Sequence, residues 1–200
     1  MKKLLIPALV IVGIIVVLYF FFGSRYNTAV TLQEDAKTAW SNVESAYQRR
    51  SDLIGNLVKT VQGAADFERN TLKEVIEARA KATAVNIDPS NITPDQIAQF
   101  QQAQGGLTSA LSKLLVTVER YPDLKANQNF LNLQTQLEGT ENRINVERNR
   151  YNEAVGSYTK FMRKFPNNIV LSIFGSLEEM ARFEADRGAE KAPDVDFNFK

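Results

Sequence analysis

The 200-residue sequence contains 24 basic and 23 acidic residues, and it has neither histidine nor cysteine. This near-balance of charge excludes nucleic-acid binding driven by bulk electrostatic attraction. Without His or Cys, the chain lacks the usual general base, the usual thiol nucleophile and most tight zinc or iron sites.

An uncharged apolar run, Leu4 to Phe22, opens the chain. As a helix it is about 28 Å long at roughly 1.5 Å per residue, close to the bilayer core of about 30 Å. A cleaved signal peptide is the alternative, but its apolar stretch would cover only about 7 to 15 residues and would end at a small-x-small site. Bulky residues occupy 19–22 instead. We therefore predict a retained single-pass anchor over residues 1–25, in the cell (inner or plasma) membrane.

The orientation of this anchor depends on few charges. Lys2 and Lys3 precede the apolar run, whereas Arg25 and the more distant Lys37 follow it. Because basic residues favour the cytoplasmic side, this small excess predicts a cytoplasmic N-terminus and an extracytoplasmic domain.

A helical period begins just after the anchor. Apolar residues, with one arginine among them, recur at alternating spacings of three and four, which places them on one face of a helix. Neither proline nor glycine separates Arg25 from Ile54, so the membrane helix is expected to continue into this helix as a stiff stalk. The stripe consists of Ala36, Trp40, Val43, Tyr47, Arg50, Ile54, Leu57 and Val61.

Three further helices are expected in the domain spanning residues 26–187. The second covers 66–84 with Asp66 as its N-cap. The third runs from Pro94 to about Arg120, with Thr93 as N-cap, Gln96 at N3 and either a local kink or a close contact point at 105–106. The fourth covers about 123–165 and a short fifth segment covers 176–187. The pattern thus predicts an all-α protein, an N-terminal transmembrane helix followed by an antiparallel four-helix bundle with long helices.

The remaining residues, 188–200, form a tail of different character. Val195, Phe197 and Phe199 alternate with polar residues, which is typical of an extended strand. The tail either adds to the sheet edge of a partner, lies against the bundle, or stays unpaired. These three residues are weak partner-binding candidates.

Several stretches spread over nearly the whole chain share one pattern. They are RYN (25–27), AWSNVESAYQRRSDLIGNLVKTV (39–61), FERNTLKEVIEAR (67–79), YPDLKANQNFLNLQTQLEGTENRINVERNRYNEAV (121–155), FP (165–166) and VDF (195–197). Together they resemble the LemA family of bacterial membrane proteins, and block 121–155 is the most specific of them. The sequence departs from the family at Gly55, where proline is usual, and a bend is expected there.

The resemblance implies a four-helix bundle behind a single membrane span, without an established enzymatic activity. It also implies a short exposed N-terminus and a cytoplasmic bundle, which opposes the orientation that Lys2 and Lys3 favour. Both orientations therefore stay open at this point.

Three charged residues fall on apolar stripes, where a bundle needs hydrophobic side chains. Arg50 lies on the first stripe, and Glu141 and Arg148 lie on the stripe of the fourth helix. Charges in a core must pair, so we predict that Arg50 contacts a carboxylate of the fourth helix, Glu141 first. The alternative is a carboxylate metal site, but such bundle sites use Glu-x-x-His and the chain has no His.

No Gly-rich phosphate loop, Gly-x-Ser-x-Gly elbow or paired-Asp motif occurs, so we predict no catalytic residues, no cofactor and no metal. The favoured function is a membrane-anchored interaction or scaffold module whose partners are the bilayer, through Leu4 to Phe22, and other proteins, with a possible homo-oligomer. The alternative is a ligand sensor or an enzyme with a polar pocket between helices.

Overall fold

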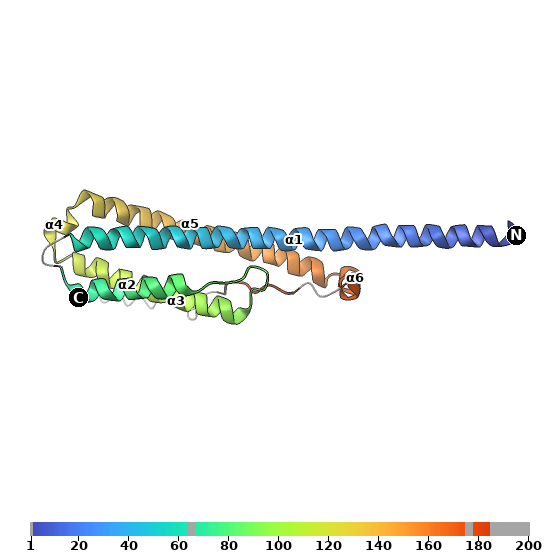
Figure 1. Cartoon of the computed structure of the whole chain (residues 1–200). Coiled ribbons are helices and arrows are strands. Elements are labelled where there is room, and N and C mark those ends of the chain that lie inside the picture. The colour runs from blue at the N-terminus through green and yellow to red at the C-terminus, as the bar shows by residue number, and fades with distance from the viewer. Residues whose placement is uncertain (1, 64–66, 175–177, 185–200) are drawn as a thin grey trace, which may run out of the picture.

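The computed structural model describes residues 2–63, 67–174 and 178–184. Within these ranges the chain forms six helices and no strand, so it is all-α as predicted (Figure 1). The helices are α1 (Lys2–Gln62), α2 (Arg69–Ala84), α3 (Pro94–Val118), α4 (Pro122–Lys125), α5 (Gln128–Arg163) and α6 (Asn167–Phe174).

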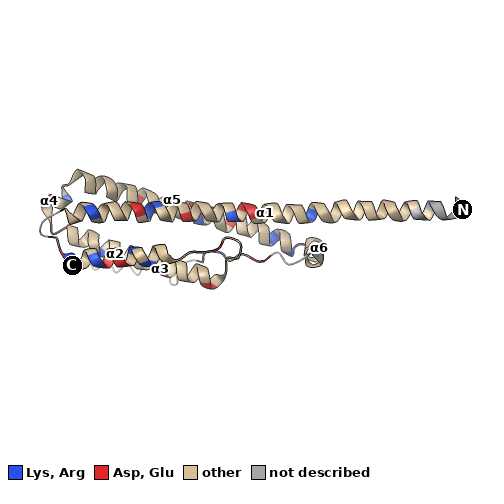
Figure 2. Cartoon of the chain, viewed as in Figure 1, with Lys and Arg blue, Asp and Glu red and all other residues tan. Residues whose placement is uncertain are grey.

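α1 is one helix of 61 residues, about 90 Å long at roughly 1.5 Å per residue. Its N-terminal part projects from the bundle and carries no charged side chain between Lys3 and Arg25 (Figure 2). This part is long and apolar enough to cross a membrane, and its described side chains lie exposed rather than in a core. The same helix then enters the bundle, where every residue of the predicted stripe is buried.

The four long helices form the predicted antiparallel bundle. α1 leads away from the apolar end, α2 returns, α3 leads away again and α5 returns (Figure 1). α1 packs along α5, and α2 packs along α3. α1 continues without a break through Gly55, where an added Cβ would lie 3.3 Å from the Arg79 guanidinium carbon. Glycine at this position therefore allows α2 to place an arginine against α1.

The core has two parts. The part far from the apolar segment of α1 is mainly aliphatic and contains Leu57, Leu114 and Leu137. The part near the anchor is aromatic and is built around Trp40, whose ring contacts Phe100 at 5.7 Å and Tyr151 at 5.2 Å between centroids. The fold therefore places its largest buried side chains near the end of the bundle from which the apolar part of α1 projects.

Two helix starts differ from the prediction. The expected fourth helix is divided, because α4 ends at Lys125 with Ala126 as its C-cap and α5 begins anew at Gln128. Asn127 caps α5, and its Oδ1 accepts from the N–H groups of Asn129 at 2.9 Å and Phe130 at 3.2 Å. α2 begins at Arg69 with no side-chain cap, and the expected cap Asp66 lies outside the described residues. The capping box of Thr93 and Gln96 is confirmed, and α3 passes through 105–106 as continuous helix.

The prediction of a short helix over 176–187 is wrong for the residues of this range that the structure describes. Residues 178–184, here called the C-terminal segment, are not helical. The segment places Met180 and Phe183 in the aromatic core, and the Ala181 N–H donates to the Ile92 carbonyl at 2.9 Å. Tertiary contacts thus hold a helix-compatible sequence in another conformation.

Candidate functional site

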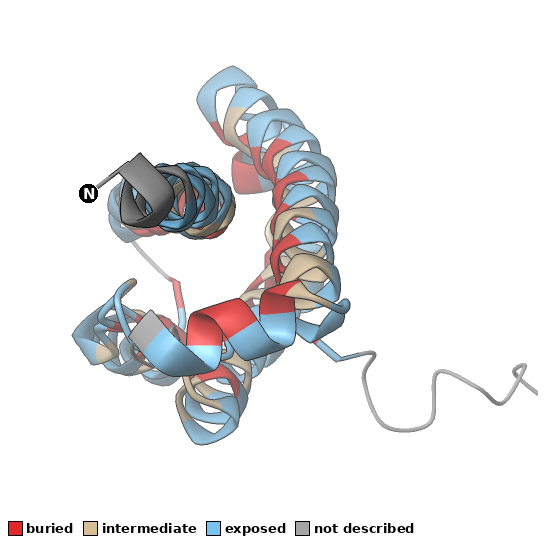
Figure 3. Cartoon of the chain, turned by 90° about the vertical axis from the view of Figure 1, so that its right-hand side faces the viewer, coloured by how far each residue is buried: buried red, intermediate tan, exposed pale blue. Residues whose placement is uncertain are grey.

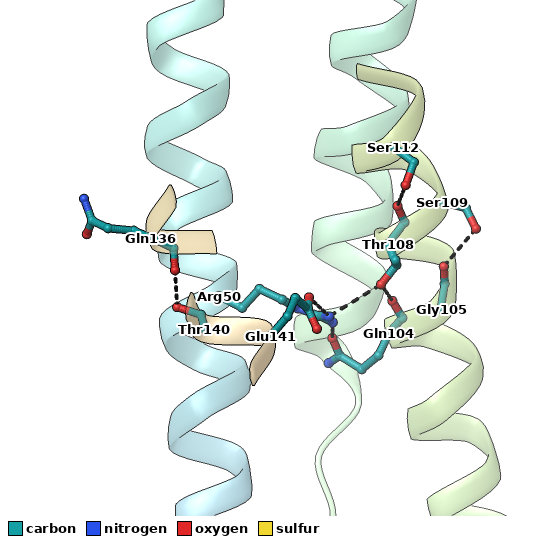
Figure 4. Close-up of polar contacts among 9 residues, drawn as sticks. All are labelled: Arg50, Gln104, Gly105, Thr108, Ser109, Ser112, Gln136, Thr140 and Glu141. Atoms are coloured by element: carbon teal, nitrogen blue, oxygen red, sulfur yellow. Dashed lines mark hydrogen bonds and ion pairs between the residues drawn. The ribbon is translucent and has the colours of Figure 1, made fainter. Parts of the chain in front are cut away.

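Arg50 lies at the centre of a polar cluster inside the bundle (Figure 4). Its Nη1 is 2.6 Å from Glu141 Oε1 on α5 and 3.4 Å from Thr108 Oγ1 on α3. Its Nη2 donates to Gln104 Oε1, also on α3. The Arg50 side chain is 4% exposed, whereas that of Glu141 is 43% exposed. The structure therefore contains the pair that the sequence predicts, with the cation buried and the carboxylate reached by solvent.

The same cluster joins all four long helices. Gln104 accepts from Arg50 through its oxygen and donates through Nε2 to the Ala82 carbonyl on α2 at 3.4 Å. The Arg50 guanidinium also lies 5.0 Å from the centroid of the Tyr47 ring, which is a cation–π distance. One buried cation thus fixes the relative positions of α1, α2, α3 and α5.

A hollow of about 220 Å³ lies beside this cluster. Its lining includes Arg50, Gln104, Glu141 and Arg148. Arg148 interacts with Tyr47 of the cluster, but its guanidinium lies 4.6 Å from the Phe183 ring centroid, and its Nη2 donates to the Glu184 carbonyl at 3.5 Å. Arg148 therefore holds the C-terminal segment rather than pairing with a carboxylate there.

Glu147 is a buried charge that the sequence reading missed. Its carboxylate is 3.1 Å from Arg150 Nη1 and 3.5 Å from Arg143 Nη2, both on α5. The signal was present, because position 147 lies three residues after Ile144 and four before Tyr151, both buried on the same stripe.

A second set of hydrogen bonds fastens the C-terminal segment to α5. The Tyr151 hydroxyl donates to the Ala181 carbonyl at 2.6 Å. Asn152 binds both backbone groups of Phe183, accepting from its N–H at 2.9 Å and donating to its carbonyl at 3.0 Å. The Tyr158 hydroxyl donates to the Glu178 carbonyl at 3.1 Å. These side chains replace the backbone partners that a helix would have supplied.

These tyrosines make the bundle sensitive to high pH. Burial, with a smaller contribution from Glu178 and Glu179, raises the pKa of Tyr158 to about 12, and burial also raises the pKa of Tyr151. An unfolded tyrosine titrates near pH 10, so above that pH the folded chain binds more protons than the unfolded chain. The stabilisation is therefore complete below pH 10 and is lost as the pH rises toward 12.

We expect urea unfolding of the full chain in detergent to show this loss between about pH 10 and 11.5. Tyr158→Phe should reduce the pH dependence and should cost about 1 kcal/mol at pH 8, because the hydrogen bond to the Glu178 carbonyl is lost. The fluorescence of Trp40, the only tryptophan, reports unfolding. An unchanged pH dependence in Tyr158→Phe would show that this hydroxyl does not carry the effect.

Among the described residues no three His, Cys, Asp or Glu side chains are grouped so that they could hold a metal ion. The tail candidates Val195, Phe197 and Phe199 lie outside the described residues. A wider open groove of about 940 Å³ lies between α1, α2 and α3, with Ser45 and Gln48 in its lining.

Comparison with known proteins identifies the family. The LemA family model matches residues 39–197, more than half of the chain. Similar relatives include the magnetosome proteins MamQ 1 and MamQ 2 of Paramagnetospirillum magneticum, each 29% identical over 189 residues that cover 85% of this chain and 70% of the relative. Protein LemA of Metamycoplasma hominis is 26% identical over 155 residues, covering 77% of this chain and 67% of the relative. The chain therefore belongs to the LemA family.

Proposed function

We propose that this protein is a membrane-anchored scaffold that holds partner proteins at a fixed height above the bilayer, without catalytic activity of its own. The observation that carries the proposal is the continuity of α1 from Lys2 to Gln62. A helix transmits position and orientation, whereas a flexible linker does not. A surface built on α1 is therefore held close to the membrane and in one orientation.

The interior polar groups support a structural role for the bundle core. Glu141 and Glu147, the two carboxylates on the inner stripe of α5, both form ion pairs with arginine. Each of these carboxylates is therefore already engaged by at least one guanidinium group of the bundle itself. The cluster thus fits helix positioning better than chemistry.

The groove between α1, α2 and α3 is the surface that we assign to a partner. Its lining is rich in small and amide side chains, which suit a polar peptide segment held by hydrogen bonds. The polar residues that α1 contributes are Ser41, Glu44, Ser45, Tyr47, Gln48, Arg49, Ser51, Asp52 and Asn56. We propose that the tail, through Val195, Phe197 and Phe199, adds a second contact to the same partner.

Site-specific photo-cross-linking in native membranes tests this assignment. A photoreactive amino acid at Gln48, which lines the groove, should give a discrete adduct, and deletion of residues 193–200 should weaken it. Asn149, exposed on α5 and outside the groove lining, is the matched control. An adduct of twice the chain mass would identify a second copy as the partner. Equal adducts from both positions would contradict the groove assignment.

The hollow beside Arg50 supports a second candidate, a sensor for a small polar ligand. Tight binding of a small molecule by the purified full chain, or turnover of one, would favour this candidate over the scaffold. We place the protein in the cell membrane and, from Lys2 and Lys3, place the bundle outside the cytoplasm.

A further inference from the structure

α6 exposes large apolar side chains at the membrane end of the bundle. Its inner face buries Val170 and Leu171. Ile169 and Ile173, one helical turn apart, are 50% and 65% exposed, and Phe165 just before the helix is 80% exposed. Side chains four residues apart lie on the same face of a helix. Two bulky apolar groups thus share the outer face of a helix whose inner face is already packed, and a third, Phe165, is exposed two residues before its start.

The position of α6 identifies what covers this face. α6 packs against α1 and α5 and lies across the end of the bundle from which the apolar part of α1 projects (Figures 1 and 3). Its axis is turned across that of α1. A helix lying across a membrane-spanning helix is parallel to the bilayer plane, which is the orientation of interfacial amphipathic helices.

The short distance along α1 between the apolar run and the bundle also places α6 near the bilayer surface. Ala29 is the first residue of α1 that the structure shows buried in the bundle. It follows the end of the apolar run, Phe22, by about 10 Å at roughly 1.5 Å per residue. The headgroup layer on each side of a bilayer is roughly 5 to 8 Å thick. Because α1 is continuous, the end of the bundle cannot move far from the headgroups.

We propose that α6 is a second membrane contact, in which Phe165, Ile169 and Ile173 insert at the boundary between headgroups and acyl chains. The contact is driven by apolar burial, and the nearby Arg163 forms a two-bond pair with Glu179, at 2.9 and 3.0 Å. Together with the span, this contact gives the bundle two points of attachment and fixes its rotation about α1. It is independent of any partner in the groove.

The absence of native cysteine allows a direct test. Single variants Ile169→Cys and Ile173→Cys of the full chain carry a spin label in phosphatidylcholine vesicles. Val116→Cys, exposed on the far end of α3, is the control. The collision rate with a water-soluble nickel complex should be at least about fivefold lower at 169 and 173 than at 116, and that with oxygen should be higher.

A second variant separates insertion from local structure. In Ile169→Ser/Ile173→Ser, a label at Phe165→Cys should become about fivefold more accessible to the nickel complex than in the chain with both isoleucines, because the apolar contribution to insertion is lost. Nickel accessibility at 169 and 173 equal to that at 116 would overturn the proposal. Strong dipolar broadening between labels would also overturn it, because a second copy would then cover the face.

Discussion

Replacing Glu141 with alanine is expected to lower the free energy of unfolding by about 3 kcal/mol, because the Arg50 guanidinium would stay buried without its carboxylate. The loss lies at the lower end of the range for broken buried pairs, since the hollow beside the cluster lets water approach Nη1. Urea unfolding of the full chain in detergent, followed by Trp40 fluorescence, measures the change.

Arg50→Met should cost less, about 1 to 2 kcal/mol. Methionine keeps much of the buried volume, and the carboxylate left behind on Glu141 is solvated. Gln104 would lose its donor, which accounts for the remaining cost. Glu138→Ala, at an exposed position one turn before Glu141, is the control and should change stability by less than about 0.5 kcal/mol. Equal losses in Glu141→Ala and Glu138→Ala would show that Arg50 is solvated.

Phe183→Ala is expected to destabilise the protein by about 3 to 5 kcal/mol. The Phe183 ring is stacked on Trp40 at 5.7 Å between centroids and packs edge-on against Tyr151, also at 5.7 Å. The Arg148 guanidinium lies 4.6 Å from the centroid of the Phe183 ring. Removal of the Phe183 ring leaves a cavity in the aromatic core, and the Arg148 guanidinium loses its aromatic contact.

The same variant should change the spectrum of native Trp40, because a stacked ring is lost beside the indole. Val116→Ala, at an exposed site, is the control and should alter neither the stability nor the spectrum. A loss below about 1 kcal/mol in Phe183→Ala would mean that the C-terminal segment is only loosely attached to the bundle.

The fold was largely predictable because its helices have strong periodic patterns. The stripe from Ala36 to Val61 is buried throughout, and Thr93 and Gln96 form the expected capping box. The division before α5 was missed because Asn127 lies within a segment whose composition favours helix on both sides. The C-terminal segment could not be predicted, since its conformation depends on Tyr151 and Asn152, which are distant in sequence.

The candidate site was partly predictable for the same reason. A charge on an apolar stripe indicates a partner of opposite charge, and this signal was enough to relate Arg50 to Glu141. It could not identify Gln104 and Thr108, because neutral polar residues on α3 carry no comparable signal. Arg148 shows that a charge on an apolar stripe does not always pair with a carboxylate, because this arginine contacts the Phe183 ring and the Glu184 carbonyl instead.

The most direct test of the scaffold proposal is to interrupt α1 between the anchor and the bundle. A flexible Gly-Ser insertion after Arg25 leaves the span and the packed residues intact but removes the rigid connection. Photo-cross-linking from Gln48 in native membranes is then compared with the uninterrupted chain. The proposal predicts that the partner adduct falls severalfold while the amount of membrane-bound protein stays constant. An undiminished adduct would contradict the claim that α1 works by holding the bundle in a fixed position.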